Sequence, residues 1–401
     1  MTTPSMEVTA PRRLYAANMW MYFTFENGQP RCDRFLASAK PVFKSLLEGA
    51  LLYDEIVVPT QDFLALTVLV GILGKQAVIE LVESETLKFV RLKGTFAYAN
   101  NDLGVVAFHM SGEGKEYPFC APTEQAITVA LTSAPGQSND PGFVRKILDA
   151  TTEVRAMELE NVLRQETMND IKSTYLRSHF AMCDDLRSRY AELGRAQAEA
   201  KMHIMTDKHG ESDAPEIYGI ISVLRMNLDL WLAQHVGCVD GTSSGPIGHV
   251  LKGKTERSLA GQAATTSFAT LRQVADLPDL GAGIMAGQIK VDQLIKLAKT
   301  RRGEQFRQWF HDACRDDPIL VAKEYVTLLR EIPRAQSLPI RILRFLAVNA
   351  VGLIPGFGTV ANFTIGVVDS FFIESWLKGN SPKYFIDDLR QLAPPQVSAM
   401  K

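Results

Sequence analysis

One short stretch of the chain has the residue types and the spacing of a phosphate-binding loop. Gly248, Gly253, Lys254 and Thr255 match the pattern G-x-x-x-x-G-K-[ST]. In such a loop, backbone N–H groups surround the phosphates, the lysine supplies a positive charge and the hydroxyl binds magnesium. The pattern therefore indicates a nucleotide as a candidate ligand and a nucleotide-dependent enzyme as a candidate function.

The residues around this pattern argue against a working phosphate loop. Such a loop follows a buried strand, whereas residues 241–247 are polar and contain Pro246, which is unfavourable in a strand. After Thr255 the sequence has almost only helical periodicity, without the further strands that a nucleotide-hydrolysing fold needs. We therefore interpret the stretch as a basic loop between domains.

A second cluster contains residue types that bind zinc. His203 and Asp207 would lie one turn apart on a helix, with His209 just beyond them, so the three could be metal ligands. Their spacing matches no metalloenzyme signature, and the surrounding residues are typical of a hydrophilic turn. His179 and Cys183, four residues apart, receive the same interpretation. Solvated surface residues are favoured, and a metal-dependent hydrolase is the alternative.

The most unusual feature is a segment without charged residues, from Phe345 to Val368. Its length matches a membrane helix, but its central glycines and proline would interrupt a single straight helix. We therefore expect a helical hairpin over residues 345–377. The residues with a role in close packing or membrane contact are Gly352, Pro355, Gly356, Gly358 and Gly366.

This hairpin has two interpretations. In the first, it is the buried core of a helical domain. In the second, it enters a membrane, with Arg341 and Arg344 at the headgroups. The buried hairpin is favoured, because residues 61–73 and 216–236 form two other nearly continuous apolar segments that are explained more simply as core helices.

The composition is that of an ordinary globular protein. The chain has 401 residues, a hydrophobic fraction of 46% and a formal net charge of −2. This charge provides no overall attraction to nucleic acid. The five cysteines are scattered and contain no C-x-x-C pair, which is typical of free thiols in a reducing cytoplasm. We expect a cytoplasmic protein of bacterial type, with peripheral contact to the inner face of a membrane as an alternative.

The predicted secondary structure changes along the chain, from a mixture of strands and helices in the N-terminal part to helices in the rest. Strands are indicated within residues 14–25, before a turn at Asn27 and Gly28, at 54–60 with an end at Pro59, and three times within 87–110, the last two as a hairpin. Gly74 and Gly237 are expected to end helices. From Asp140, a predicted N-cap residue, helical patterns predominate to residue 236 and again in the last third of the chain.

The predicted fold class is α+β, with a small N-terminal α/β domain followed by a larger, mainly helical body. A loose arm is expected over residues 1–12, followed by an α/β domain over 13–118. A long-helix domain over 119–240 and a helical domain over 241–401, which contains the hairpin, complete the predicted organisation.

These observations favour an interaction or effector protein over an enzyme. The sequence identifies neither a set of catalytic residues nor a cofactor. A protein is the expected partner, a membrane surface is a second candidate partner, and nothing indicates nucleic acid. The alternative is a metal-dependent hydrolase or a nucleotide-dependent enzyme whose site is not visible in the sequence.

Overall fold

The structure of this chain is a computed structural model with two compact units. The first unit comprises residues 1–42 and 55–261, and the second comprises residues 43–54 and 262–401. The residues that the structure describes are 11–19, 24–26, 29–31, 43–44, 46–101, 104–110, 121–172, 215–238, 240–242, 264, 266–272, 275, 277, 279–313, 320, 325 and 382–392.

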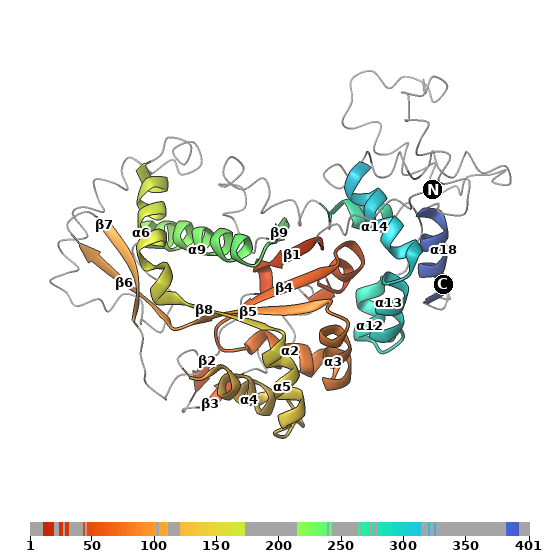
Figure 1. The fold of residues 1–401 in the computed structure, drawn as a ribbon, viewed down its shortest axis with the longest axis horizontal. Coiled ribbons are helices and arrows are strands. Elements are labelled where there is room, and N and C mark those ends of the chain that lie inside the picture. Colours follow the sequence, from red (N-terminus) through yellow and green to blue (C-terminus); the bar gives the residue numbers. More distant parts are fainter. Residues whose placement is uncertain are drawn as a thin grey trace, which may run out of the picture. The chain divides into compact units, whose positions relative to one another are not determined.

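The first unit is built on a sheet of five parallel strands (Figure 1). The strand order is β8-β5-β4-β1-β9, and the register places Leu14 between Ile56 and Asp240. The expected combination of a sheet with many helices is confirmed. The strands are β1 (Arg13–Ala16), β4 (Glu55–Thr60), β5 (Leu87–Lys93), β8 (Thr151–Arg155) and β9 (Asp240–Thr242).

Two of these strands lie where the sequence did not indicate strands. β8 interrupts a stretch that was expected to be helical, and β9 lies in the stretch that was interpreted as a loop between domains. Both are short strands at the edges of the sheet, and each pairs with a neighbour on one side. A strand of three to five residues is too short to show a clear periodicity. The sheet therefore includes residues well beyond 118.

Pro59 lies inside the central strand β4 instead of ending it. Backbone N–H groups of β4 alternate in direction: Ile56 donates to Thr86 on the β5 side, and Glu55 donates to Arg12 on the β1 side. Pro59, four residues after Glu55, faces the β1 side. The pairing with β1 ends at Val57, so a proline at this position removes no hydrogen bond from the sheet.

Four helices cover one face of the sheet (Figure 1). As predicted, Gly74 ends the first of them, with a φ of 83°, and the Asp140 side chain accepts a hydrogen bond from the backbone N–H of Phe143. Pro141 occupies the first turn of the helix that Asp140 caps. These helices are α2 (Leu64–Leu73), α3 (Lys75–Glu83), α4 (Thr123–Ser133) and α5 (Pro141–Asp149).

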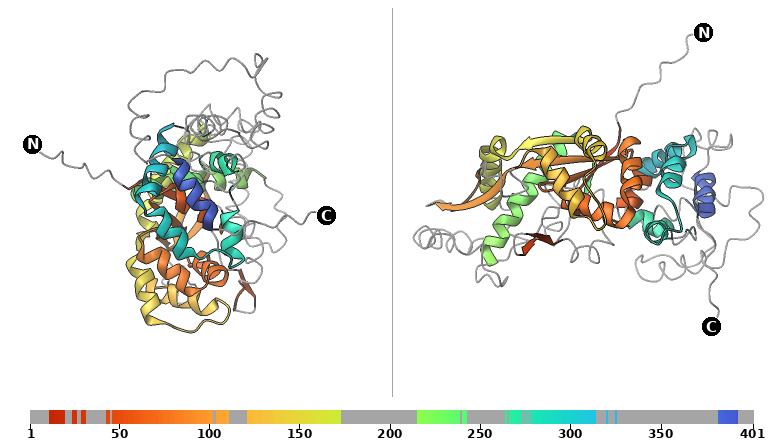
Figure 2. Two further views of the ribbon diagram at one scale, coloured as in Figure 1. Left: turned by 90° about the vertical axis from the view of Figure 1, so that its right-hand side faces the viewer. Right: turned by 90° about the horizontal axis from the view of Figure 1, so that it is seen from below.

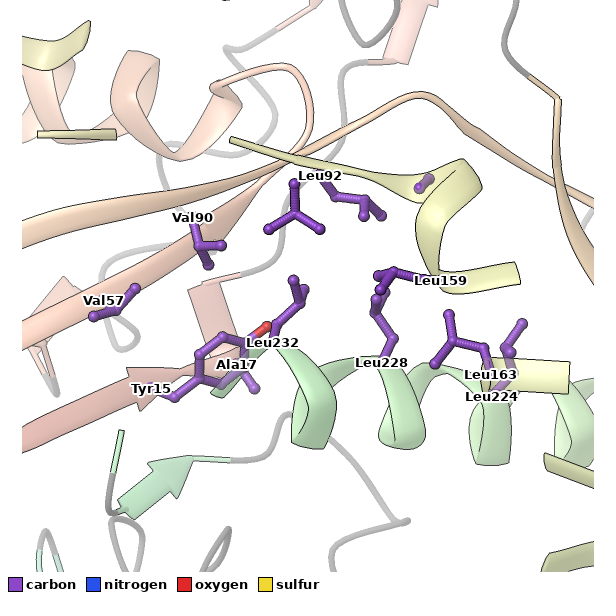
Figure 3. Packing of buried hydrophobic residues seen from close by; sticks show 12 residues of the cluster. Tyr15, Ala17, Val57, Val90, Leu92, Leu159, Leu163, Leu224, Leu228 and Leu232 are labelled. Carbon is purple, nitrogen blue, oxygen red and sulfur yellow. The ribbon is translucent and has the colours of Figure 1, made fainter. Parts of the chain in front are cut away.

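Two helices, α6 (Ala156–Lys172) and α9 (Pro215–His235), cover the opposite face. Leucines at one-turn spacing on α9 pack against α6 and against side chains of β1, β4 and β5 (Figure 3). Gly237, with a φ of 68°, follows the end of α9 as predicted. The buried leucines of the two helices are Leu159, Leu163, Leu224, Leu228 and Leu232.

The distribution of helices follows from the handedness of parallel connections. From β1 to β4, β5 and β8, the chain moves across the sheet in one direction, and α2 to α5 lie on one face. From β8 to β9 the chain returns past β1, in the opposite direction. Right-handed connections require helices on the opposite face after such a reversal, which is where α6 and α9 lie.

Two antiparallel hairpins accompany the main sheet. β2 (Thr24–Glu26) pairs with β3 (Gln29–Arg31), and the predicted turn at Asn27 and Gly28 lies outside the described residues. β6 (Thr95–Asn101) pairs with β7 (Gly104–Met110), and this confirms a prediction. Figure 2 shows the second hairpin beside α6, which contacts β7.

The described residues of the second unit form helices and the short connections next to them. Helical residues occur at 43–44, 46–52, 264 and 266–272, followed by α12 (Leu280–Met285), α13 (Val291–Ala298), α14 (Arg301–Ala313) and α18 (Pro382–Leu392). The helices share an aromatic core, in which Phe306 stacks on Phe310 and on Phe385. Helical periodicity therefore predicted most of the described part of the last third correctly, although neither α12 nor α18 was predicted.

Within the described ranges, no single helix is long and apolar enough to cross a membrane. The predicted hairpin over residues 345–377 lies outside these ranges.

Substitution in the core between α9 and the sheet provides a test of the layer arrangement. Leu228 has an exposed fraction of 1%, whereas Val162 on α6 is 45% exposed. We expect Leu228→Ala to lower the free energy of unfolding by about 2–5 kcal/mol, because truncation of a buried leucine side chain leaves a cavity in the core. Val162→Ala should change it by less than about 0.5 kcal/mol. Urea denaturation measures both, and equal effects would contradict the arrangement.

Candidate functional site

The site residues predicted from the sequence lie outside the described residues. Their roles stay predictions, as do those of His179 and Cys183 and the two interpretations of the hairpin. They are the phosphate-loop match Gly248, Gly253, Lys254 and Thr255; the metal candidates His203, Asp207 and His209; and the hairpin residues Gly352, Pro355, Gly356, Gly358 and Gly366.

β9 changes the context of the phosphate-loop match. From the sequence, the match was interpreted as a loop between domains, partly because no strand was expected before Gly248. The structure has a strand of the parallel sheet that ends at Thr242, a few residues before that glycine. β9 is an edge strand, so the arrangement differs from a phosphate loop that follows a central strand.

The pairing of β1 with β9 creates the point where the strand order reverses. The chain runs from β1 to β4 on one side in the strand order, and it enters β9, on the other side of β1, only after α9. In open parallel sheets, ligands bind outside the carboxyl ends of the strands at such a reversal. The carboxyl ends concerned are Ala16 and Thr242, which are aligned in the register.

Elsewhere, the carboxyl edge of the sheet is filled by a network around Arg91. This β5 residue is fully buried, and its guanidinium donates to the carbonyl of Gln61 over 3.0 Å and to that of Ala121 over 2.9 Å. It also donates to the Thr123 hydroxyl over 2.6 Å and lies 3.8 Å from the Glu153 carboxylate. The Thr123 hydroxyl donates in turn to Glu153.

This network is structural and not a binding site for an external anion. Each guanidinium nitrogen of Arg91 has a protein acceptor, and burial excludes a further ligand. The network joins the ends of β4, β5 and β8 to the start of α4. The sequence analysis did not identify Arg91, although an arginine inside the apolar segment "LKFVRL" was a usable signal.

The loop after β4 also uses its own polar groups internally. The Gln61 side chain donates to the Gly94 carbonyl over 2.6 Å, and the Asp62 carboxylate accepts from the backbone N–H of Leu64. Thr60 accepts from the N–H of Phe63, a buried residue in the left-handed region with a φ of 61°. These two N–H groups at the start of α2 are therefore occupied by side chains of the protein.

One polar contact lies next to the β1–β9 pair on the face covered by α9. The Tyr15 hydroxyl donates to the Asp229 carboxylate over 2.9 Å, and Tyr15 is aligned with Gly241 of β9. The contact fixes the tyrosine ring between the sheet and α9. The position of α9 is thereby tied to the strand pair at the reversal point.

Charged groups at the opposite, amino edge hold β1, β4 and β5 together. Glu55 accepts hydrogen bonds from Arg13 over 2.6 Å and from Lys88 over 2.9 Å. Burial would raise the pKa of Glu55, but the hydrogen bonds from Lys88 and Arg13 outweigh it and lower the pKa. These residues keep the strand ends in register.

Cys238, close to this edge, is unsuited to nucleophilic chemistry. Burial raises its pKa to about 12, although the positive charge of Arg13 acts in the opposite direction. A thiol with such a pKa is almost fully protonated near neutral pH. Within the described residues, no group of three His, Cys, Asp or Glu side chains could hold a metal ion.

No family model, curated protein or solved structure matches this chain significantly. The carboxyl ends of β1 and β9 are therefore assigned as the candidate site on the topology and the contacts alone.

Replacing the buried cation tests the role of the Arg91 network. Arg91→Met should lower the free energy of unfolding by about 3 kcal/mol or more, because two carbonyls and the Thr123 hydroxyl lose their donor and the Glu153 carboxylate loses its ion-pair partner. Arg145→Met is the control, since Arg145 on α5 is 72% exposed and pairs with Asp149 one turn away. The control should change stability by less than about 0.5 kcal/mol. A loss below about 1 kcal/mol for Arg91→Met would contradict the role.

The pKa of Cys238 predicts slow alkylation of the folded protein. At pH 8, the thiolate fraction should be about a thousandfold lower than for a thiol with the ordinary value of 9.0. Mass spectrometry after N-ethylmaleimide treatment measures the rate, with the chain unfolded in guanidinium chloride as the control. Equal rates in the folded and unfolded chain would contradict the burial. The measurement uses a variant with serine at Cys32, Cys120, Cys183 and Cys314.

Proposed function

We propose that this chain binds a phosphate-bearing small molecule, of which a nucleotide is the leading candidate, at the carboxyl ends of β1 and β9. The observation that supports the proposal is the reversal of strand order between these two strands. In open parallel sheets this reversal is the preferred ligand position, whatever the chemistry of the ligand.

The choice of a phosphate group rests on the sequence that follows β9. Lys254 and Thr255, with Gly248 and Gly253, have the spacing of a phosphate loop, and their segment begins at the carboxyl end of a parallel strand. Backbone N–H groups in a glycine-containing loop suit the several oxygens of a phosphate, and a lysine provides the charge. The proposal therefore revises the interpretation of this stretch as a loop between domains.

The contacts of the other strands support the same location. Around the ends of β4, β5 and β8, the donors of Arg91 and Gln61 are used within the protein. A ligand there would have to break hydrogen bonds between buried groups.

Ligand binding is compatible with the interaction or effector role expected from the sequence. In such a protein, occupancy of the site controls the exposure or the affinity of another surface. Chemistry on the ligand is not required, so the proposal concerns binding and not catalysis.

Isothermal titration calorimetry of the full chain with ATP, GTP and inorganic phosphate, each with magnesium, tests the proposal. We expect one of these to bind, and Lys254→Ala to weaken its affinity about tenfold or more, because a charge-assisted hydrogen bond is lost. Lys299→Ala is the control, since this exposed lysine belongs to the second unit. Absence of binding, or equal affinity of wild type and Lys254→Ala, would contradict the proposal.

Hydrogen exchange with and without the ligand locates the site independently of the lysine. Binding should slow amide exchange in peptides that contain residues 14–19 and 238–242. Peptides that contain β8, at the far edge of the sheet, should show no change. Slower exchange at β8 without an effect at β1 and β9 would place the ligand elsewhere.

A further inference from the structure

A short segment of the chain belongs to a different unit from the residues on either side of it. In sequence, Phe43–Asp54 connects β3 to β4, which are both elements of the first unit. In the structure, it is part of the second unit. Its described residues are helical up to Leu52, and its apolar side chains are buried.

Ion pairs hold the start of this segment in the second unit. Lys44 lies 2.5 Å from Asp279, the residue that caps α12, and Glu48 lies 3.1 Å from Arg272. Arg272 is also 3.2 Å from Asp279, so the four charges alternate in sign. Glu48 is buried, and burial raises its pKa although Arg272 and Lys44 act in the opposite direction. Because Glu48 is buried, its charge is stable only while Arg272 stays close to it.

The end of the segment is fixed to α14 by its last three residues. The Leu52 carbonyl lies 2.6 Å from Nε2 of His311, and the Tyr53 ring packs edge-on against the same imidazole at 4.9 Å. Asp54 pairs with the buried Arg307 over 3.0 Å. Arg307 donates in addition to the Ala298 carbonyl at the end of α13, over 2.6 Å.

The next residue begins the central strand of the first unit. Glu55 is the first residue of β4, pairs with Arg13 and Lys88, and donates its backbone N–H to Arg12. Domains within a chain are usually joined by exposed, flexible linkers. Here, a residue anchored in one unit and a residue anchored in the other are consecutive, and no linker lies between Asp54 and Glu55.

We propose that the segment Phe43–Asp54 is a coupling element that makes the stability of the second unit depend on the first. Its charged and aromatic side chains pack within the second unit, and the peptide bond between Asp54 and Glu55 joins it directly to β4. The two units consequently unfold in one cooperative step. This inference is independent of the proposed ligand.

Insertion of Gly-Ser-Gly between Asp54 and Glu55 in the full chain tests the coupling. The same three residues inserted between Gly136 and Gln137, in the turn after α4, are the control. Hydrogen exchange as a function of urea concentration follows β4 and α14 separately. We expect β4 and α14 to open in one common transition in the wild type and in the control, and in two transitions after insertion at Asp54.

Two results would overturn the proposal: separate transitions already present in the wild type, or one common transition that persists after insertion at Asp54. The substitution Asp54→Asn provides a second test if the insertion prevents folding. It removes the negative charge beside Arg307 within the second unit and should lower the midpoint of β4 together with that of α14. A shift confined to α14, or no shift of either midpoint, would count against the coupling. The exposed pair in α13, altered by Asp292→Asn, is the matched control.

Discussion

The architecture of the first unit depends on the pairing of β1 with neighbours on both sides. One neighbour, β4, continues the sheet towards β8, and the other, β9, is reached only after the chain has crossed back. Because parallel connections are right-handed, this return requires α6 and α9 on the face opposite to α2–α5. Both faces of the sheet are thereby covered, which is the condition under which short parallel strands are stable. The candidate site is a consequence of the same pairing.

At β4, β5 and β8, away from the reversal point, the carboxyl edge of the sheet is filled by a buried arginine, Arg91. Arg91 is tolerated in the core because its donors meet the carbonyls of Gln61 and Ala121 and the Thr123 hydroxyl. An uncompensated charge in this position would be strongly destabilising. The network also supports the loop after β4, where Phe63 adopts a left-handed conformation that is unfavourable for an aromatic residue.

Local signals in the sequence predicted much of this fold correctly. Asp140 caps α5, Gly74 and Gly237 follow the ends of helices, and the hairpin of β6 and β7 lies where alternating residues indicated strands. Each of these features is determined by residues near to one another in the sequence. The buried helices α2 and α9 were also evident, because a helix without a polar face must be covered.

The features that were missed depend on contacts between distant residues. β8 and β9 exist because each pairs with one strand of a sheet, and neither contains enough residues to show a period. Pro59 fits β4 only because β1 ends before it. The role of Arg91 depends on acceptors from the loop after β4 and from the start of α4. For the same reason, the sequence could not show that Gly248 follows a strand of a parallel sheet.

The position of β9 beside β1 is the central claim, and interstrand amide–amide nuclear Overhauser effects in a deuterated sample test it most directly. The account predicts effects from the strand β1 to β4 and also to β9, with Tyr15 near both Val57 and Gly241. Effects from β1 to β4 alone, with β9 paired to another strand or to none, would contradict it.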